Sequence, residues 1–293
     1  MIWPKICSRL YSIMHLIPNK EILMKISYIA SVLALGLFAS TNASAVVVGG
    51  VDFGATGTFQ HIETATFANT FIAPGSAVGT QTIGYGKVST INSSSDYCAG
   101  SCTLYYTYSA ELSQTAGVPV INLTNSVYSF YLSGASDIDF YTQTSAQNIA
   151  YIQAQSEWVR LTGHDITPLI FPAPAGTDYQ IITLTYNATS FQGLGSGLAD
   201  VDQNWGLADV VSYLDSDQVT DGSGGFADVT ITSSVSSAER NPMDTCTFLT
   251  GQFCLDGTAN LRGSTNYVPE PGGLALLGLG ALGLGVLRRR KVA

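Results

Sequence analysis

The chain has 293 residues, with 12 Lys and Arg against 21 Asp and Glu and with five cysteines. Eight of the 12 basic residues lie before residue 26 or after residue 287, so residues 46–267 hold four Lys and Arg against 19 Asp and Glu, a net charge of −15. Binding to nucleic acid or to anionic lipid rests on clustered Lys and Arg. We therefore expect neither as a partner of this acidic body, whose length suits one sizeable domain.

An export signal is predicted over residues 24–45. Lys25 precedes an apolar run over residues 26–39, and Ala43 and Ala45 supply the small side chains that signal peptidase prefers. The expected partners of this segment are signal peptidase and the general secretion machinery. After cleavage, the mature chain would begin near residue 46.

Residues 1–23 precede a signal that is already complete. A signal peptide normally has a charged region of only a few residues before its apolar run, and Met24 with Lys25 provides one. We interpret Met24 as the true start, which makes residues 1–23 a misassigned or untranslated stretch. A signal with an unusually long charged region is the alternative.

Alternating apolar and polar residues recur through residues 46–266. In residues 103–108, Leu104, Tyr106 and Tyr108 share one face. Such alternation is typical of antiparallel strands with one buried and one solvated face. Clusters of Gly, Asn, Ser and Asp separate the runs, so we expect an all-β fold, an antiparallel β-sandwich or jelly-roll-like domain. Further runs of this kind cover residues 128–132, 180–187 and 227–232.

Two other patterns bear on the fold. Residues 148–161 are the one stretch of the body that favours a helix, and a proline-rich loop follows it. A five-residue motif, Gly-Leu-Ala-Asp-Val, occurs twice and a third time with Phe for Leu. Its irregular spacing excludes a solenoid of stacked repeats. We interpret its copies as strands that meet a glycine turn and place Asp at an exposed edge; they cover residues 197–201, 206–210 and 225–229.

Four cysteines of the body predict disulfides in an oxidising compartment. Cys98 and Cys102 are four residues apart, and Cys246 and Cys254 are eight apart. We favour two local bridges, 98 with 102 and 246 with 254. A zinc site is the alternative, but neither pair has the Cys-x-x-Cys spacing.

The body of the chain contains few residues that could perform catalysis. Of the histidines only His61 and His164 lie in the body, and the adjacent His164 and Asp165 would point apart on a strand. Two acid pairs could in principle cleave glycosidic bonds, which needs two carboxyl groups about 5 to 9 Å apart. Acids are common here, so we interpret these as surface carboxylates and expect no enzyme. The pairs are Glu157 with Asp178 and Asp137 with Asp139.

We expect no cofactor other than calcium, for which two oxygen-rich turns are candidate sites. Calcium prefers carboxylate and amide oxygens. The first turn is not an EF-hand, because Trp205 and Val211 stand where that loop needs Gly and Glu. The candidate ligands are Asp200, Asp202 and Asn204 in the first turn and Asp215, Asp217 and Asp221 in the second.

The last 27 residues form three parts in a fixed order. Two prolines around a Glu favour an extended backbone, and the uncharged run of 16 residues over 272–287 would give a helix of about 24 Å. A basic cluster follows, which would remain on the cytoplasmic side of a membrane. The first part is Pro269, Glu270 and Pro271, and the basic cluster is Arg288, Arg289, Arg290 and Lys291.

This arrangement resembles the PEP-CTERM tail of exported proteins from Gram-negative bacteria that make extracellular polysaccharide. The resemblance implies that residues 267–293 are a sorting and anchor segment with a single membrane helix. It implies an exosortase as partner, which would cut near Glu270 and discard the helix. The protein would then be anchored transiently in the inner membrane before it reaches the cell surface or the extracellular space. An unprocessed membrane anchor is the alternative.

Two function classes follow for residues 46–266. In the first, the protein is a surface or matrix component associated with exopolysaccharide, biofilm or flocculation; residues 190–265 loosely resemble flocculation-associated proteins that bear this tail. In the second, it is a secreted carbohydrate-active enzyme or a carbohydrate-binding module on a β-sandwich scaffold. A cleft with two convergent carboxylates would favour the enzyme, and a filled core would favour the matrix component.

Overall fold

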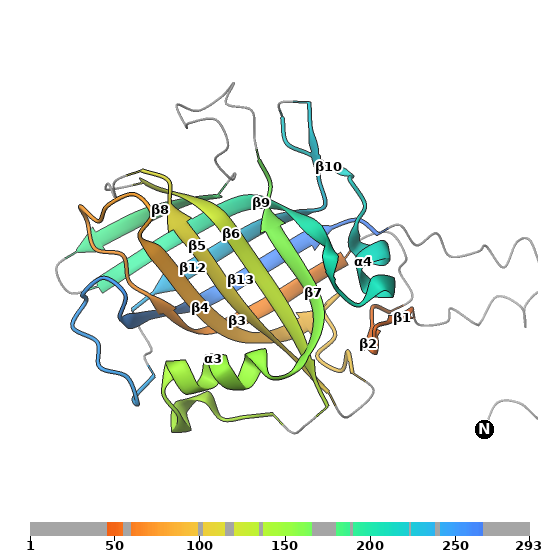
Figure 1. Cartoon of the computed structure of the whole chain (residues 1–293), viewed down its shortest axis with the longest axis horizontal. Helices are drawn as coiled ribbons and strands as arrows, with labels where there is room; N and C mark the ends of the chain where they lie inside the picture. Colours follow the sequence, from red (N-terminus) through yellow and green to blue (C-terminus); the bar gives the residue numbers. More distant parts are fainter. Residues whose placement is uncertain are drawn as a thin grey trace, which may run out of the picture. The chain divides into compact units, whose positions relative to one another are not determined.

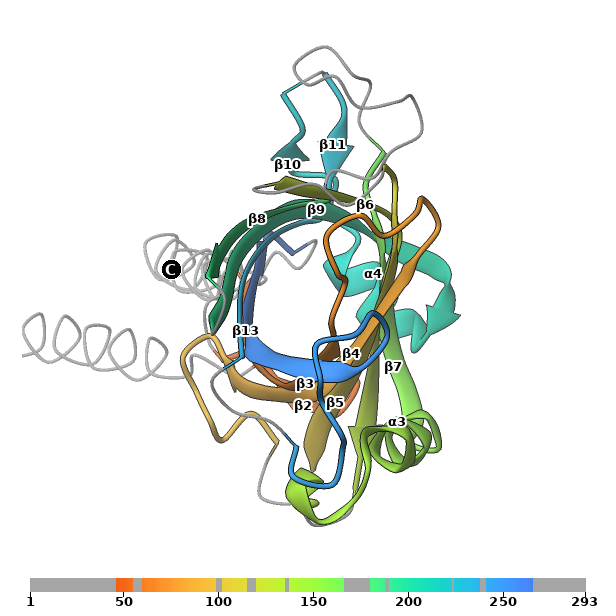
Figure 2. The same ribbon diagram turned by 90° about the vertical axis from the view of Figure 1, so that its left-hand side faces the viewer.

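Nine antiparallel strands form a single sheet that closes on itself (Figures 1 and 2). In this computed structural model, β3 to β7 are joined in chain order, β9 pairs with β12, β12 with β13, and β13 returns to β3. The last pairing leaves no sheet edge between the first and last long strands. The strands are β3 (Gln60–Thr70), β4 (Gln81–Ile91), β5 (Thr103–Leu112), β6 (Val120–Ser133), β7 (Ser156–Gly163), β8 (Gln180–Asn187), β9 (Ser190–Gly206), β12 (Val229–Ser236) and β13 (Phe253–Gly263).

The described residues all belong to one compact unit. They are residues 46–54, 60–98, 102–114, 120–134, 137–165, 180–187, 190–222, 224–237 and 241–265. The predicted signal peptide, the proline-rich loop and the sorting tail lie outside them. Within these ranges no helix is both long and apolar enough to cross a membrane.

β7 and β8 share one position in the ring. β6 pairs with β7 through residues 127–132 and with β8 through residues 120–123, while β9 pairs with both on its other side. The barrel therefore has eight strand positions, the number that leaves an interior just wide enough for side chains or one small ligand.

Short elements complete the fold. Two two-stranded ribbons are formed by β1 (Val47–Val48) with β2 (Val51–Asp52) and by β10 (Val219–Thr220) with β11 (Phe226–Ala227). The helices are η1 (Phe140–Thr142), α3 (Ser145–Gln153) and α4 (Ala208–Leu214). Helix α3 lies outside the barrel beside β5, and α4 lies near one barrel end (Figure 1).

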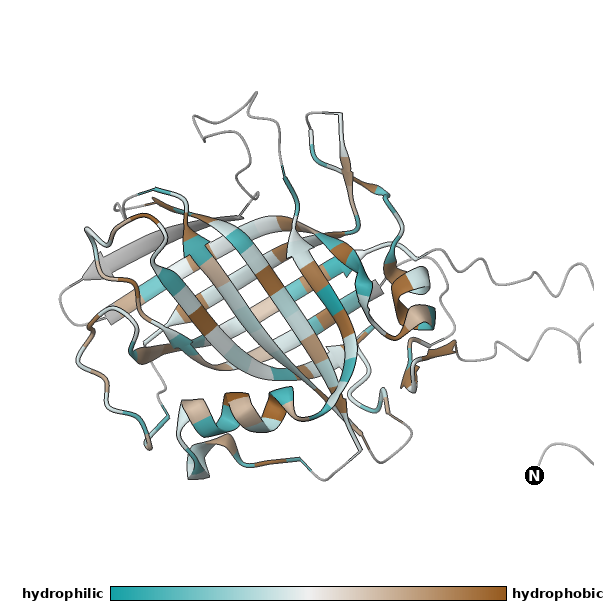
Figure 3. Cartoon of the chain, viewed as in Figure 1, coloured by the Kyte–Doolittle hydropathy of each residue, from teal (hydrophilic) through white to brown (hydrophobic). Residues whose placement is uncertain are grey.

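Residues of different hydropathy alternate along several strands (Figure 3), and the apolar set of β5 and β6 forms part of the core. Leu104 and Tyr106 of β5 and Tyr128 and Phe130 of β6 point inward and are at most 9% exposed. Each buried side chain of this size contributes about 1.5 to 3 kcal/mol by leaving water. The phenol of Tyr106 satisfies its polar end with the hydroxyl of Thr66 at 2.6 Å.

The barrel end near α4 is filled by aromatic side chains. Phe53 stacks on Trp158 and packs against Tyr213, with ring centroids 6.2 and 4.9 Å apart. Trp158 is fully buried and donates its indole N–H to the carbonyl of Gly49. Gly49 has φ +55° and a Cβ there would come within 2.3 Å of Val210, so only glycine fits this turn.

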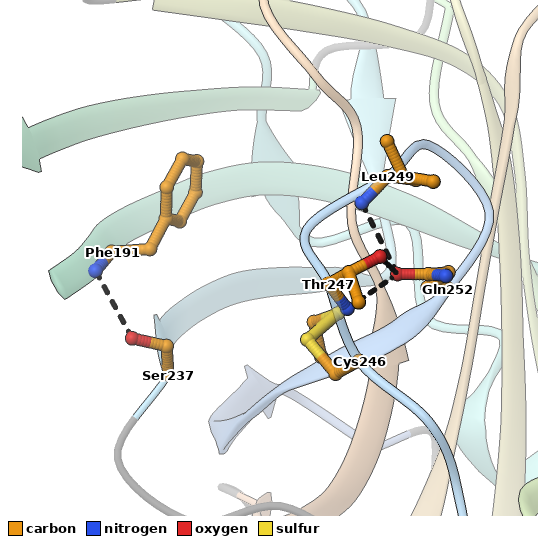
Figure 4. The surroundings of a disulfide bond; sticks show 7 residues. Phe191, Ser237, Cys246, Thr247, Leu249 and Gln252 are labelled. Carbon is orange, nitrogen blue, oxygen red and sulfur yellow. Dashed lines mark hydrogen bonds between the residues drawn. A yellow bond between two sulfur atoms is a disulfide. The ribbon is translucent and has the colours of Figure 1, made fainter. Parts of the chain in front are cut away.

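The opposite end is covered by the loop that the Cys246–Cys254 disulfide closes (Figure 4). Phe71 packs edge-on against Phe191 and Phe248 at 4.9 and 5.5 Å. The side-chain oxygen of Gln252 accepts the main-chain N–H groups of Thr247 and Leu249. These bonds give the loop a fixed shape without regular secondary structure.

Helix α3 covers a second apolar cluster on the outer face of the sheet. Thr144 and Gln147 form a capping box at its start. Below it, the amides of Asn148 and Asn241 both donate to the hydroxyl of Tyr85, at 2.8 and 3.3 Å. Tyr85 is fully buried, so these bonds satisfy its polar end.

The predicted antiparallel all-β class is confirmed, while the arrangement of the strands differs. One meandering sheet closes into a barrel, where the sequence predicted a sandwich or jelly roll made of two sheets. Alternation sets which face of a strand is buried, and it is the same in both architectures. The strands predicted over residues 103–108, 128–132 and 180–187 lie within β5, β6 and β8.

Two local predictions were wrong. The helix expected over residues 148–161 is α3, which spans Ser145–Gln153, and β7 follows from Ser156. The reason is that Trp158 and Val159 are drawn into the barrel core, where burial outweighs local helix propensity. The second copy of the five-residue motif, residues 206–210, begins α4 instead of a strand.

Both predicted local disulfides are present. Cys98 pairs with Cys102 and Cys246 with Cys254, each with a Cα–Cα distance of 5.3 Å. The first bridge closes the turn before β5, and the second ties the end loop to the start of β13. Each constrains a short loop in the unfolded chain.

Candidate functional site

Asp228 is the centre of an acidic cluster beside the α4 end of the barrel. It lies between β11 and β12 and is only 1% exposed. One carboxylate oxygen accepts the main-chain N–H groups of Ser216 and Asp217, and the other accepts that of Val201 at 2.8 Å. Three donors thus compensate the buried charge. The prediction that this Asp stands at an exposed edge was wrong. Asp228 can be buried because main-chain N–H groups from distant parts of the chain bond its carboxylate, and the local sequence does not indicate those donors.

Asp215 and Asp217 approach Asp228 from the segment after α4. Carboxylate oxygens of the three residues lie within 4.8 Å of one another. Burial raises the pKa of Asp215, and the negative charges of Asp228 and Asp217 raise it further, while the amide of Gln203 opposes the shift through a 2.9 Å bond. Carboxylates this close repel one another, and a cation between them would reduce that repulsion.

A hard cation such as calcium needs six to eight oxygen ligands. Asp215, Asp217 and Asp228 would supply three carboxylates, and the oxygens of Asp228 already accept backbone donors. Water would have to complete any coordination shell. The structure thus brings together two members of the predicted second turn and adds Asp228, which the sequence analysis missed.

His164 follows β7, and its partner Asp200 is close enough to Asp228 and Asp217 to feel their charges. Its Nδ1 lies 2.9 Å from both oxygens of Asp200 on β9, and its Nε2 lies 3.4 Å from Asp221 before the β11 strand. Ionised carboxylates only accept hydrogen bonds, so the two contacts together require an imidazolium with two N–H donors. The predicted calcium candidates Asp200 and Asp221 therefore have a histidine as partner.

Opposing effects set the pKa values of this pair. Burial lowers the pKa of His164, but the hydrogen bonds and negative charges of Asp200 and Asp221 outweigh it, so the pKa is raised overall. The pKa of Asp200 is also raised, by burial and by the negative charges of Asp228 and Asp217, although His164 opposes the shift. Both ring nitrogens of His164 contact carboxylates, and this geometry favours a charged imidazolium.

The first predicted turn does not gather its three residues around one point. Asp202 accepts the main-chain N–H of Asn204 at 3.0 Å, a local turn contact, and lies 3.7 Å from the guanidinium of Arg160. Asp200 is bonded to His164 instead. The carboxylates of Asp200 and Asp202 therefore have different partners.

The candidate acid pairs have structural partners. Asp137 pairs with Lys87 and accepts the hydroxyl of Tyr105, whose pKa is raised to about 12, first by burial and also by the charge of Asp137. Asp139 accepts the main-chain N–H of Tyr141 and so begins η1. Glu157 is exposed on β7, and its proposed partner lies outside the described residues. His61 bonds Asn260 at 3.1 Å.

One tryptophan remains accessible on the outside of the barrel. Trp158 is in the core, whereas Trp205 at the end of β9 is half-buried. The guanidinium of Arg160 lies 4.3 Å above its ring, and Tyr131 meets it edge-on at 5.5 Å. Asp202 lies beside Arg160. The outer sheet thus combines an aromatic ring with charged hydrogen-bonding groups.

The predicted sorting and cleavage residues, from Ala43 and Ala45 at one end to residues 269–291 at the other, lie outside the described residues. Residues 268–291 match the family model of the PEP-CTERM protein-sorting motif. No curated protein and no solved structure matches the chain. The match covers the tail alone and does not indicate a function for residues 46–266.

Proposed function

We propose that this exported protein, which carries a PEP-CTERM sorting motif for an exosortase, is a non-enzymatic component of the cell surface or extracellular matrix, associated with exopolysaccharide in biofilm or flocculation. The observation that carries the proposal is the sorting motif at residues 268–291. It supports export to the cell surface and processing by an exosortase. A role in the matrix goes beyond what the sorting motif implies and is the part that we add.

The small size of the cavities in the barrel supports a non-enzymatic role. Three cavities lined by described residues have volumes of about 50, 30 and 10 Å³. A water molecule needs at least about 10 to 15 Å³ of such space, so none of them admits a sugar chain. Among the described residues that line these cavities there is no Asp, Glu or His. The described acidic residues that lie close together are outside these cavities, around Asp228 and around His164.

The acidic surface supports an extracellular role. Residues 46–267 carry a net charge of −15, which keeps an exported domain soluble and attracts divalent cations. Such cations can bridge carboxylates of the protein to carboxylates of an acidic polysaccharide. In this proposal the anionic cluster around Asp228 is one bridging position on the barrel.

The experiment follows the location of the protein and the amount of biofilm in the producing cells. Replacing Pro269, Glu270 and Pro271 by Ala keeps the apolar run and the basic cluster, so only the sorting motif changes. We expect this variant to remain in the membrane fraction and biofilm mass to fall. The control is Arg262→Ala on the barrel. Normal surface display of the triple variant would contradict the sorting step, and unchanged biofilm with lost display would contradict the matrix role.

Trp205 favours carbohydrate binding as a second candidate function. Its half-buried ring carries the Arg160 guanidinium over one face, with Asp202 next to Arg160, so an aromatic group and charged hydrogen-bonding groups stand together on the outer sheet. A glycan array compares the exported protein with Trp205→Ala and with the control Phe226→Ala, whose ring is 53% exposed on β11. Binding that only Trp205→Ala removes would support this function; signals equal in all three proteins would exclude this surface.

A further inference from the structure

The barrel interior contains space at its middle. β9 has glycine at positions 193, 195 and 197, which alternate with outward residues such as Leu194, 69% exposed. These positions have the same parity along the strand as buried Phe191 and Ala199, so their missing side chains lie on the inner face. The cavity of about 50 Å³ borders Gly195 and, across the barrel, three tyrosines; these are Tyr106, Tyr108 and Tyr128.

A second cavity of about 30 Å³ lies next to the first. The two share Asn69 and Val235 among their lining residues. The second is closed by Ile72 and by Phe191, whose ring packs on Phe71 at the end of the barrel covered by the disulfide loop. At about 10 to 15 Å³ for each water-sized group, the pair has room for about six such groups.

Asn69 gives this space a defined polar group. The residue is only 9% exposed. Its side-chain oxygen accepts the hydroxyl of Thr82 at 2.9 Å, and Thr82 in turn accepts from Thr70 at 3.3 Å. Its amide nitrogen makes no hydrogen bond to any of the residues that the structure describes. Because Asn69 lines both cavities, this N–H₂ group can donate a hydrogen bond to an acceptor inside them.

The other lining side chains decide the chemistry of an occupant. Ile121, Phe191 and Leu255 provide apolar walls around the smaller cavity. The polar lining residues are uncharged Ser, Thr, Tyr and Asn, and among the described residues no charged side chain lines either cavity. A charged molecule would lose its hydration without an ionic partner, whereas a neutral one with a single oxygen would match the lining.

We propose that the barrel interior binds one small uncharged molecule of about six non-hydrogen atoms, which accepts a hydrogen bond from Asn69 through a carbonyl oxygen and packs its hydrocarbon part against Ile121, Phe191 and Leu255. A monosaccharide is too large for this space. The site is therefore independent of the polysaccharide role proposed above, and either can fail without the other.

The test uses cyclopentanone, with cyclopentane as the probe that lacks the oxygen. The exported protein is titrated with each probe and followed by NMR, and crystals are soaked with cyclopentanone. We expect the ketone in the cavities, with its oxygen about 3 Å from the amide nitrogen of Asn69. Ordered water alone at saturating ketone would overturn the proposal.

Matched variants separate the hydrogen bond from the space. Asn69→Leu should weaken ketone binding about tenfold, the effect of one lost hydrogen bond, and leave cyclopentane binding unchanged. Val235→Phe fills the shared wall and should abolish binding of both probes, whereas Leu194→Phe, outside the barrel on β9, should change neither. If Asn69→Leu does not fold, the Val235→Phe variant and the wild-type crystal soaked with cyclopentanone still test whether the ketone binds in the barrel. Ketone binding that survives Val235→Phe would overturn the proposal.

Discussion

The carboxylate of Asp228 accepts the main-chain N–H of Val201 at 2.8 Å, where the start of β12 meets β9. The same carboxylate holds the two N–H groups that follow α4. One buried side chain therefore connects a barrel strand to the segment after a helix. Its charge is compensated by main-chain dipoles, and the nearest carboxylates add to the negative charge.

Asp228→Ala should lower the free energy of unfolding by about 3 kcal/mol or more, because three main-chain donors lose their charged acceptor. Urea denaturation of the exported protein at pH 7 measures the change. Asp96→Ala is the matched control, since Asp96 is exposed in the turn after β4, and it should change stability by less than about 0.5 kcal/mol. Equal effects of the two substitutions would exclude Asp228 as a structural centre.

The calcium hypothesis concerns Asp215, Asp217 and Asp228. If calcium binds there, millimolar calcium should raise the Tm relative to excess chelator, because a ligand that binds only the folded state stabilises it. Asp217→Asn should remove this shift, since Asp217 is the exposed member of the three. Asp139→Asn at η1 serves as the control. A Tm that is the same in calcium and in chelator would exclude the site.

The contacts of His164 predict a pH-dependent stability. Its folded pKa is raised above the ordinary value of 6.5, so protonated His164 stabilises the folded protein. This contribution is complete below about pH 6.5 and is lost as the pH rises through the folded pKa. His164→Gln should therefore be less stable than the wild type at pH 5.5 and show a smaller difference at pH 9.

Chemical denaturation in excess chelator checks this dependence without interference from cations. The matched control is His61→Gln, whose ring bonds the neutral side chain of Asn260 and lies 3.6 Å from the more exposed Glu63. A stability difference for His164→Gln that grows toward pH 9 would contradict the imidazolium assignment.

The disulfide that closes the longer loop should contribute slightly more to stability, because loop entropy grows with the logarithm of loop length. Replacing Cys246 and Cys254 by Ser should cost about 2.5 kcal/mol, and replacing Cys98 and Cys102 about 2 kcal/mol, from loop entropy alone. Thermal melts of the two double variants measure this order. A larger loss for the shorter loop would show that the turn before β5 depends on its bridge for native packing as well.

The sequence by itself determined features that depend on neighbouring residues. Alternation predicted which side chains of β5 and β6 line the barrel interior, because side chains of a strand point to opposite faces whatever sheet it joins. It wrongly predicted a solvated outer face, since Tyr105 and Tyr131 on that face are buried in the second cluster. Cysteines four and eight residues apart predicted local bridges, since short chain segments meet without help from the fold. The tail was recognised because a sorting signal is read as a linear segment.

Only the tertiary structure decided the closure of the sheet and the partners of the acids. The return of β13 to β3 joins strands about 200 residues apart, and no local pattern specifies it. His164 meets Asp200 and Asp221 across 36 and 57 residues, and Asp228 finds its donors at β9 and after α4. Burial of Trp158 in the barrel overrode the helical preference of its segment. In each case the deciding energy comes from contacts that exist only after the chain has closed into a barrel.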